Sequence, residues 1–428
     1  MKTHEVFGIR PSLTEHSYVD RGSLDREFLR LVERKQVHIA VRGASKSGKS
    51  WLRQRVLKEP LIVQCRLSYT TADVYRDALA HLDIRLEIEK ATTDTFGGRI
   101  TASGEAGLKL IAKVTGEGEV SYSKEFHRTD RPVGKDGSDL KFIADLIRES
   151  GRTLVIEDFH YLSVAEQRRF SFDLKTFWDY GTFVVVVGVW ISENMLITLN
   201  PDLSDRIEEL SVTWQETELK QVFQKGCKAL NFRPKDAIAT HLANISYESV
   251  GLLQKLALRY LDELSIEDSA DAGTEIVLEN EAKLSDAAMY VAEQLNQLYQ
   301  TFARRVCDGV RKRANATGIY AHAMAVIMDA GDGQLSDGMS AKDIHTAAHA
   351  RQPRILLANL RAVLAKFAEL QVDEDGRGLV IAYDSQNEKI SLVDRQLLLY
   401  RRFATVKWPW EDLIAEVDRK GESAYVDE

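Results

Sequence analysis

The chain has 428 residues, a formal net charge of -8, and 44% hydrophobic and 29% charged residues, which excludes wholesale disorder and predicts two or three domains. The longest compact apolar run, residues 183–189, is far shorter than the roughly 18–20 residues of a membrane helix, which argues against a membrane protein. The first residues carry no apolar signal core. The three cysteines, Cys65, Cys227 and Cys307, show no pairing or metal-site spacing. We therefore expect a cytoplasmic protein with reduced thiols.

The N-terminal half alternates short apolar runs with helical patterns. Continuous apolar strands that alternate with helices are typical of a parallel sheet covered on both faces. After a polar segment, residues 1–35, we predict an α/β core over residues 36–212, with its last strand at the sheet edge. The predicted strands are residues 37–41, 61–65, 154–156, 183–189 and 207–212.

Residues 92–137 differ in character from the rest of this core. Gly, Ser, Thr and charged residues dominate, and residues 109–120 show a weak period-two alternation. This pattern predicts an exposed hairpin or insertion rather than part of the core.

The chain becomes helical after residue 212. Helices are predicted near residues 216–230, 234–244 and 249–264, which we group as a helical unit over residues 213–266. Thr213 and Glu216 fit a capping box at the start of the first helix.

Residues 275–315 form one long amphipathic helix or a broken pair. The basic cluster at residues 304–313 is either a nucleic-acid patch or a solvated helix end favoured by the helix dipole.

Residues 316–410 have the element order of a winged helix, and residues 411–428 form a tail. Helices are predicted at residues 319–330, 340–350 and 353–370, followed by two strands at residues 378–383 and 389–393. In such a module the third helix often enters the major groove of DNA.

The third helix of this module supplies the candidate contacts to double-stranded DNA. Arg354 and Arg361 lie seven residues apart and are expected on one helix face. The candidate DNA-binding residues are Arg351, Arg354, Arg361 and Lys366. Residues 316–407 hold eleven Lys and Arg against eleven Asp and Glu. Because affinity for DNA comes mostly from phosphate neutralisation, this neutral module is also a candidate for binding a protein.

The glycine-rich turn after the first strand matches the motif G-x-x-x-x-G-K-[ST]. Its glycines let backbone N–H groups surround a phosphate, and Lys49 places a positive charge on the β- and γ-phosphates. Ser50 offers a hydroxyl to Mg²⁺, and the following helix adds its positive dipole end. The sequence therefore predicts a site for ATP and Mg²⁺. The predicted nucleotide-binding residues are Gly43, Ala44, Ser45, Lys46, Ser47, Gly48, Lys49, Ser50 and Trp51.

Such a site also needs an acid, which usually ends a neighbouring buried strand. Glu157 and Asp158, after the strand at residues 154–156, are the acids so placed. They resemble a Walker B element with two adjacent acids. The resemblance implies that Glu157 takes the metal side and Asp158 polarises the attacking water. Glu157 departs from the usual Asp, and the two roles could be reversed.

The order of motifs and elements resembles the AAA+ superfamily and its relatives, the STAND ATPases, with most similarity to the origin-recognition-like and transposition-regulator branches. The resemblance covers about residues 15–410, and only the P-loop and the Walker B element are motif-specific. It implies an α/β P-loop NTPase core, a helical lid over residues 213–266 and a C-terminal winged-helix domain.

The resemblance also implies residues that complete the site. An arginine finger that reaches a neighbouring subunit falls on Arg206; the alternative is a salt bridge of Arg206 with Glu208 or Glu209. The expected polar sensor at the tip of the strand at residues 183–189 is absent, and Ser192 or Asn194 are its substitutes. The lid lacks the usual sensor arginine. Its weak replacements are Lys255 and Arg259.

Three functions stay open. The first is an ATP-hydrolysing homo-oligomeric switch that recruits DNA or a protein effector, by analogy in mobile-element biology or anti-phage defence. The second is a nucleotide-binding scaffold with little hydrolysis, which the missing sensor and the Glu157 departure favour. The third is a DNA-binding regulator that ATP only tunes.

Overall fold

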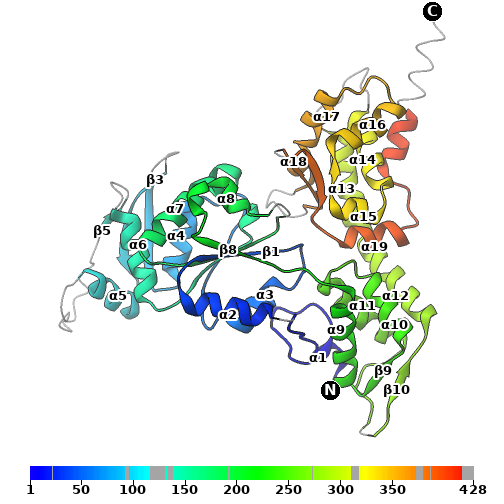
Figure 1. The fold of residues 1–428 in the computed structure, drawn as a ribbon, viewed down its shortest axis with the longest axis horizontal. Coiled ribbons are helices and arrows are strands. Elements are labelled where there is room, and N and C mark those ends of the chain that lie inside the picture. Colours follow the sequence, from blue (N-terminus) through cyan, green and yellow to red (C-terminus); the bar gives the residue numbers. More distant parts are fainter. Residues whose placement is uncertain are drawn as a thin grey trace, which may run out of the picture. The chain divides into compact units, whose positions relative to one another are not determined.

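The structure is a computed structural model of the chain. It describes residues 1–21, 23–91, 96–115, 131–133, 138–190, 193–271, 273–309, 318–372, 379–385 and 387–416. The chain divides into two compact units (Figure 1). The core unit comprises Asp20–Gly43 and Gly48–Val212; the C-terminal unit comprises Met1–Val19, Ala44–Ser47 and Thr213–Glu428.

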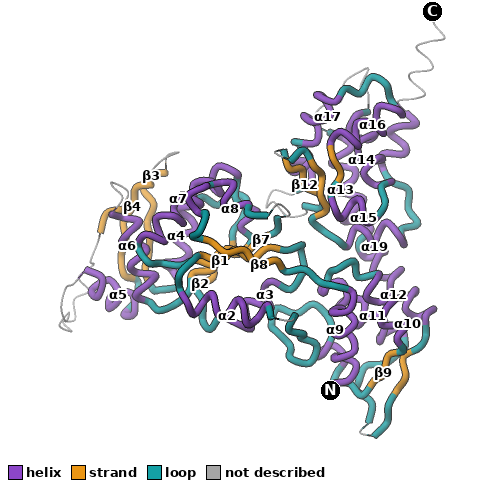
Figure 2. Tube along the Cα trace, in the orientation of Figure 1, coloured by secondary structure: helices purple, strands orange, loops and turns teal. Residues whose placement is uncertain are grey.

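The core unit contains the predicted parallel sheet, whose strands are orange in Figure 2. Its strand order is β2-β6-β7-β1-β8. Because every neighbouring pair is parallel, the carboxyl ends of all five strands meet at one edge. The last strand lies at the sheet edge, as predicted. The strands are β1 (His38–Arg42), β2 (Leu61–Gln64), β6 (Leu154–Glu157), β7 (Val184–Gly188) and β8 (Ile207–Ser211).

Helices cover both faces of this sheet, because successive side chains of a strand point to opposite faces. Ile39 and Val41 of β1 pack in one apolar cluster with α2 and α3, whereas Ala40 packs in another with α4, α6 and α7. The central strand β7 is buried along its whole length, which explains its unbroken run of valines. The helices are α2 (Leu24–Arg34), α3 (Lys49–Val56), α4 (Thr71–Ala80), α6 (Ser138–Glu149), α7 (Val164–Asp179) and α8 (Met195–Leu199).

The stretch expected to be an exposed hairpin is in part core. Its described residues supply β4 (Phe96–Ala102) and β5 (Arg131–Val133), which form an antiparallel sheet with the preceding strand β3 (Ile84–Ala91), and helix α5 (Glu105–Thr115). Residues 109–115 are helical, so the strand-like interpretation of their alternation was wrong. The rest of the predicted insertion, residues 92–95, 116–130 and 134–137, lies outside the described residues.

Residues 105–115 form a helix because one side of this helix packs against the core. Ile111 of α5 and Ile100 of β4 are buried in the same apolar cluster as α4 and α6. Gly107 permits the close approach, since a Cβ there would lie 2.1 Å from the carbonyl oxygen of Asp83. The exposed charged residues between these contacts produced the misleading alternation.

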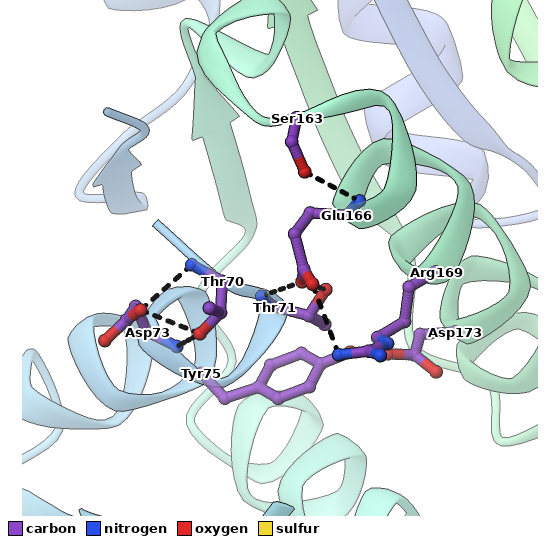
Figure 3. Close-up of polar contacts among 8 residues, drawn as sticks. All are labelled: Thr70, Thr71, Asp73, Tyr75, Ser163, Glu166, Arg169 and Asp173. Atoms are coloured by element: carbon purple, nitrogen blue, oxygen red, sulfur yellow. Dashed lines mark hydrogen bonds and ion pairs between the residues drawn. The ribbon is translucent and has the colours of Figure 1, made fainter. Parts of the chain in front are cut away.

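A polar network joins α4 to α7 within the core unit (Figure 3). Glu166 accepts hydrogen bonds from the backbone N–H of Thr71 at 2.7 Å and from its hydroxyl at 2.8 Å, and pairs with Arg169 at 3.2 Å. The hydroxyl of Tyr75 donates to the carboxylate of Asp173. Burial raises the pKa of Asp173 to about 6, although the Tyr75 hydrogen bond and the charge of Arg169 oppose the shift.

The C-terminal unit begins with the predicted helices. The first, α9, starts at Glu216 behind Gln215, whose backbone N–H donates to Glu218 at 2.8 Å. The predicted capping box at Thr213 and Glu216 was therefore wrong. The elements are α1 (Thr3–Val6), α9 (Glu216–Ala229), β9 (Phe232–Pro234), α10 (Asp236–Asn244), α11 (Val250–Glu263) and β10 (Ile276–Leu278).

Residues 275–315 contain the broken pair of helices that was one of the two alternatives. After β10 come α12 (Glu281–Gln294) and α13 (Asn296–Asp308). Arg304 and Arg305 lie on α13, whereas residues 310–313 of the predicted basic cluster lie outside the described residues.

The last segment consists of helices and a three-stranded antiparallel sheet of order β11-β13-β12. The predicted third helix is split into α17 and α18, and Arg354 precedes α17. The expectation that Arg354 and Arg361 share a helix face was therefore wrong. The elements are α14 (Ile319–Asp329), α15 (Asp332–Asp337), β11 (Met339–Ser340), α16 (Ala341–Arg351), α17 (Leu357–Leu364), α18 (Phe367–Gln371), β12 (Ile381–Asp384), β13 (Lys389–Leu392) and α19 (Gln396–Phe403).

The late start of α17 has a local cause at Ile355. Its side chain is buried, and its carbonyl oxygen lies 3.1 Å from a ring nitrogen of His345 and 3.0 Å from one of His349. Both histidines lie on α16, so this carbonyl is occupied by side chains rather than by a helical N–H. Within the described residues, no helix combines the length and apolar character that crossing a bilayer requires.

Candidate nucleotide site

The predicted phosphate loop lies between β1 and α3, as the motif requires. Two of its residues, Lys46 (φ 61°) and Gly48 (φ 89°), adopt left-handed backbone conformations that turn the chain sharply into the helix. Lys49, the first residue of α3, donates a hydrogen bond from Nζ to the carbonyl of Gly43 at 2.9 Å. Ser50 follows on the exposed side of α3. This strand, loop and helix carry the donors that a phosphate needs.

The surroundings of Lys49 shift its pKa in a way that an anionic ligand would reverse. Burial lowers the pKa of Lys49 to about 8, and the charges of Asp158 and Glu157 oppose this shift. A bound phosphate would add negative charge and restore the ammonium form. Lys49 and both predicted acids thus act on one another at the carboxyl edge of the sheet.

The two acids have different partners. Glu157, the last residue of β6, forms a buried ion pair with Arg53 of α3, at 2.6 Å between Oε1 and Nε. Asp158 follows with a left-handed backbone (φ 56°), and its Oδ2 accepts a hydrogen bond from Gln64 Nε2 at 3.3 Å. Glu157 is therefore held by a cation and Asp158 by a neutral amide.

Sequence reasoning missed Arg53 and Gln64. Gln64 ends β2 directly opposite Glu157, so a search for polar residues at strand ends could have found it. Arg53 lies four residues after Lys49 on α3, where an arginine looks like part of a solvated helix face. Its partner is distant in sequence, so no local signal marks the pair.

Of the two predicted sensor substitutes after β7, Asn194 is the one that lies among the described residues. Asn194 contributes its backbone N–H to Glu209 Oε2 at 3.2 Å, and Ser192 lies outside the described residues. Glu209 also pairs with Arg42 at 2.6 Å and accepts from the indole of Trp190 at 3.1 Å. This network ties the end of β7 to the residue before the phosphate loop.

Arg206 lies directly before β8, at the amino ends of the strands, whereas the phosphate loop lies at their carboxyl ends. Its guanidinium stacks over Trp178 at 4.7 Å from the ring centroid, and its Nη1 donates to the carbonyl of Asp202 at 2.5 Å. In the described part of the chain Arg206 makes no ion pair with Glu208 or Glu209, the alternative considered for it; Glu209 pairs with Arg42.

Residues Ala44–Ser47 contact other parts of the C-terminal unit, to which they belong. The indole of Trp214 donates to the carbonyl of Ser47 at 2.7 Å, and the N–H of Gly251 donates to that of Lys46 at 3.0 Å. Burial and the charge of Lys46 lower the pKa of Lys255.

The second weak sensor candidate, Arg259, has partners of its own. It pairs with Glu263 and lies over the ring of Tyr290 at 3.5 Å. Of the two weak candidates, Lys255 is the one coupled to the loop.

The candidate DNA-binding residues are not one continuous helix face. Arg351 pairs with Asp329 at 2.8 Å, and Arg361 with Glu388 at 2.7 Å. Arg354 donates to the side chain of Gln352 at 3.3 Å, and Lys366 is exposed directly before α18. Two of the four cations are thus neutralised by acids of the same unit.

The core has the α/β fold of P-loop ATPases. No protein family model and no curated protein matches the sequence. Among solved structures, a Walker-type ATPase of Pyrococcus abyssi matches 93% of this chain and 99% of its own, with a TM-score of 0.54 and 13% identity.

Two further structures match at TM-scores too low to establish a shared fold. The ORC1 protein of Aeropyrum pernix in complex with DNA covers 92% of this chain and 94% of its own, at a TM-score of 0.40 and 11% identity. A STAND protein with a tetratricopeptide repeat sensor from Pyrococcus horikoshii covers 96% of this chain and 45% of its own, at 0.36 and 11%.

Proposed function

We propose that this protein binds ATP with Mg²⁺ and hydrolyses it to ADP and phosphate. The observation that carries the proposal is Lys49, half-buried at the start of α3 and electrostatically coupled to Asp158 and Glu157. A lysine at a helix N-terminus beside acids at strand ends is the arrangement that phosphoryl transfer to water uses. Residues 43–51 would hold the phosphates through their backbone N–H groups.

The contacts favour Asp158, rather than Glu157, as the acid on the metal side. The Ser50 hydroxyl and the Asp158 carboxylate are the hard oxygen donors that Mg²⁺ prefers, and they are the residues that would hold it. Bound there, the ion would neutralise charge on the transferring phosphate. Glu157 is paired with Arg53, so it keeps α3 against β6, and Asp158 is the acid that remains for the metal ion.

Arg206 supports the proposal that the protein works as a homo-oligomer. It directly precedes β8, at the amino ends of the strands, whereas the phosphate loop follows the carboxyl end of the neighbouring parallel strand, so Arg206 is remote from its own subunit's loop. The contact with Trp178 fixes the position of its half-buried guanidinium. An AAA+ or STAND-like switch, in which Arg206 completes the site of a neighbouring subunit, accounts for both features.

The winged-helix-like order of α14, α16, α17 and the β11-β13-β12 sheet supports an output through double-stranded DNA or a protein effector. The process that this output serves, in the cytoplasm, would be mobile-element control or anti-phage defence, by analogy of architecture.

The test is ATP turnover measured together with particle size, with and without ATP and duplex DNA. We expect turnover by the full chain, its loss in Lys49→Ala, and larger particles with ATP. Lys175→Ala, a surface lysine of α7 paired with Asp179, is the matched control and should hydrolyse ATP normally.

A second candidate function, a nucleotide-binding scaffold with little hydrolysis, is favoured by the Arg53–Glu157 pair, which withdraws one acid from the site. Tight ATP binding without turnover, even with DNA present, would support the scaffold and contradict the ATPase proposal.

A further inference from the structure

A histidine occupies the position where the strand-end sensor is missing. His160 lies just after β6, in the short helical turn Phe159–Tyr161. Its Nδ1 accepts a hydrogen bond from the backbone N–H of Val189, directly after β7, at 3.2 Å. The imidazole thus bridges the carboxyl ends of β6 and β7. Since β7 pairs with β1, the strand that leads into the phosphate loop, the ring lies at the edge where the nucleotide is expected.

The Val189 contact fixes the protonation of the ring. A nitrogen that accepts an N–H carries no proton, so the proton of the neutral imidazole sits on Nε2. Among the described residues, Nε2 makes no hydrogen bond. The ring is therefore an uncharged donor, and the positive charge of Lys49 acts on it.

The position of the ring is defined by packing. It packs against Tyr161, with ring centroids 4.3 Å apart and a tilt of 33° between the rings. Gly188, the last residue of β7, leaves room for the indole of Trp190, since a Cβ there would lie 2.4 Å from the ring, whereas its 3.5 Å from the backbone nitrogen of His160 is an ordinary contact. A donor that is fixed on one side and unpaired on the other is suited to an anionic oxygen next to Lys49.

We propose that the Nε2–H of His160 donates a hydrogen bond to the terminal phosphate of bound ATP and so reports its presence to the end of β7. The inference rests on the proposed function, because it deepens the same nucleotide site. His160 then takes the place of the polar strand-tip residue that Ser192 or Asn194 was expected to supply.

A chain of contacts connects His160 to the residue before the phosphate loop. A shift of the imidazole toward the phosphate pulls on Val189, which precedes Trp190. Trp190 and Arg42 both contact Glu209, and Arg42 is the last residue of β1, directly before the phosphate loop. Loss of the terminal phosphate on hydrolysis releases this connection, so ATP and ADP give different positions of the β7 end.

The test compares affinities of the full chain for ADP and for a non-hydrolysable ATP analogue, both with Mg²⁺. His160→Phe keeps a ring to pack against Tyr161 but has no donor. We expect it to bind ADP as wild type does and to lose affinity for the analogue by about tenfold or more, the value of a hydrogen bond to a charged group. His160→Gln, which retains an N–H donor, should recover part of the loss.

A direct readout does not depend on variants. In protein labelled with ¹⁵N-histidine, the analogue should move the Nε2 resonance of His160, and ADP should not. Equal affinities of His160→Phe and wild type for the analogue, equal losses for both nucleotides, or an Nε2 resonance that moves alike with both, would each overturn the role of His160. A wild-type chain that binds neither nucleotide would overturn the proposed function itself, and the role of His160 with it.

Discussion

Arg53 and Glu157 form a buried ion pair, with 2.6 Å between Nε and Oε1 and side chains only 10% and 12% exposed. Arg53 comes from the helix that follows the phosphate loop, and Glu157 from the end of the acid-bearing strand. The pair therefore joins the two motifs of the candidate site through a charge contact. Substituting only one of the two residues leaves the charge of the other uncompensated in the protein interior.

We predict that Arg53→Met destabilises the fold by about 3–5 kcal/mol, because it leaves the carboxylate of Glu157 buried and unpaired. Urea unfolding measures this change. The double variant Arg53→Met with Glu157→Leu removes both charges and should recover most of the stability. A double variant as unstable as the sum of the two single variants would show that the pair itself contributes little.

How far the sequence predicted this site depended on how local the signals were. The valines of β7 and the acids that end β6 are marks of a parallel sheet, and they predicted its strands and its functional edge. The Arg53–Glu157 pair joins residues far apart in the chain, and Arg53 alone looks like a surface residue. The segment before α17 was mispredicted for a similar reason, since Ile355 is held by histidines of another helix.

A second prediction concerns the pH dependence of nucleotide binding. The pKa of Lys49 is about 8 because of burial, and a bound phosphate raises it again. Below pH 8 the lysine already carries its charge, whereas above pH 8 binding must be accompanied by proton uptake. Nucleotide affinity should therefore fall as the pH rises through 8 to 9.

Calorimetry in two buffers of different ionisation enthalpy measures the proton uptake. Lys49→Arg keeps its charge throughout this range, so its affinity, although lower, should not vary with pH from 7 to 9. An affinity of the wild-type chain that is constant over the same range would contradict the shifted pKa.

A third prediction follows from Asp173, whose carboxylate accepts the hydroxyl of Tyr75 (Figure 3). Its pKa is raised from 3.8 to about 6, so between these values the folded chain binds a proton that the unfolded chain releases. This contribution stabilises the fold at low pH and is lost as the pH rises through 6. Asp173→Asn should remove it, and should gain stability relative to wild type at pH 7.5 but not at pH 4.5.

The shift of about two pKa units bounds the gain at about 3 kcal/mol. Urea unfolding of both proteins at the two pH values gives the difference. Asp179→Asn, on the same helix but exposed and paired with Lys175, is the matched control and should show no such pH-dependent gain. If Asp173→Asn changes stability equally at both pH values, the carboxyl of Asp173 is not protonated in the fold.

The last prediction tests the proposed DNA contact by substituting Glu388, the acidic residue that pairs with Arg361. Glu388 neutralises Arg361 at 2.7 Å, so DNA must compete with this carboxylate for the guanidinium. If α17 meets the duplex, Glu388→Gln should raise the affinity severalfold, whereas Lys366→Ala should lower it and reduce the slope of log affinity against log salt by about one. Fluorescence anisotropy with a labelled duplex at several salt concentrations measures both changes. Because both residues are exposed, neither substitution should alter folding, and an affinity unaffected by either one would place the output of this unit on a protein partner.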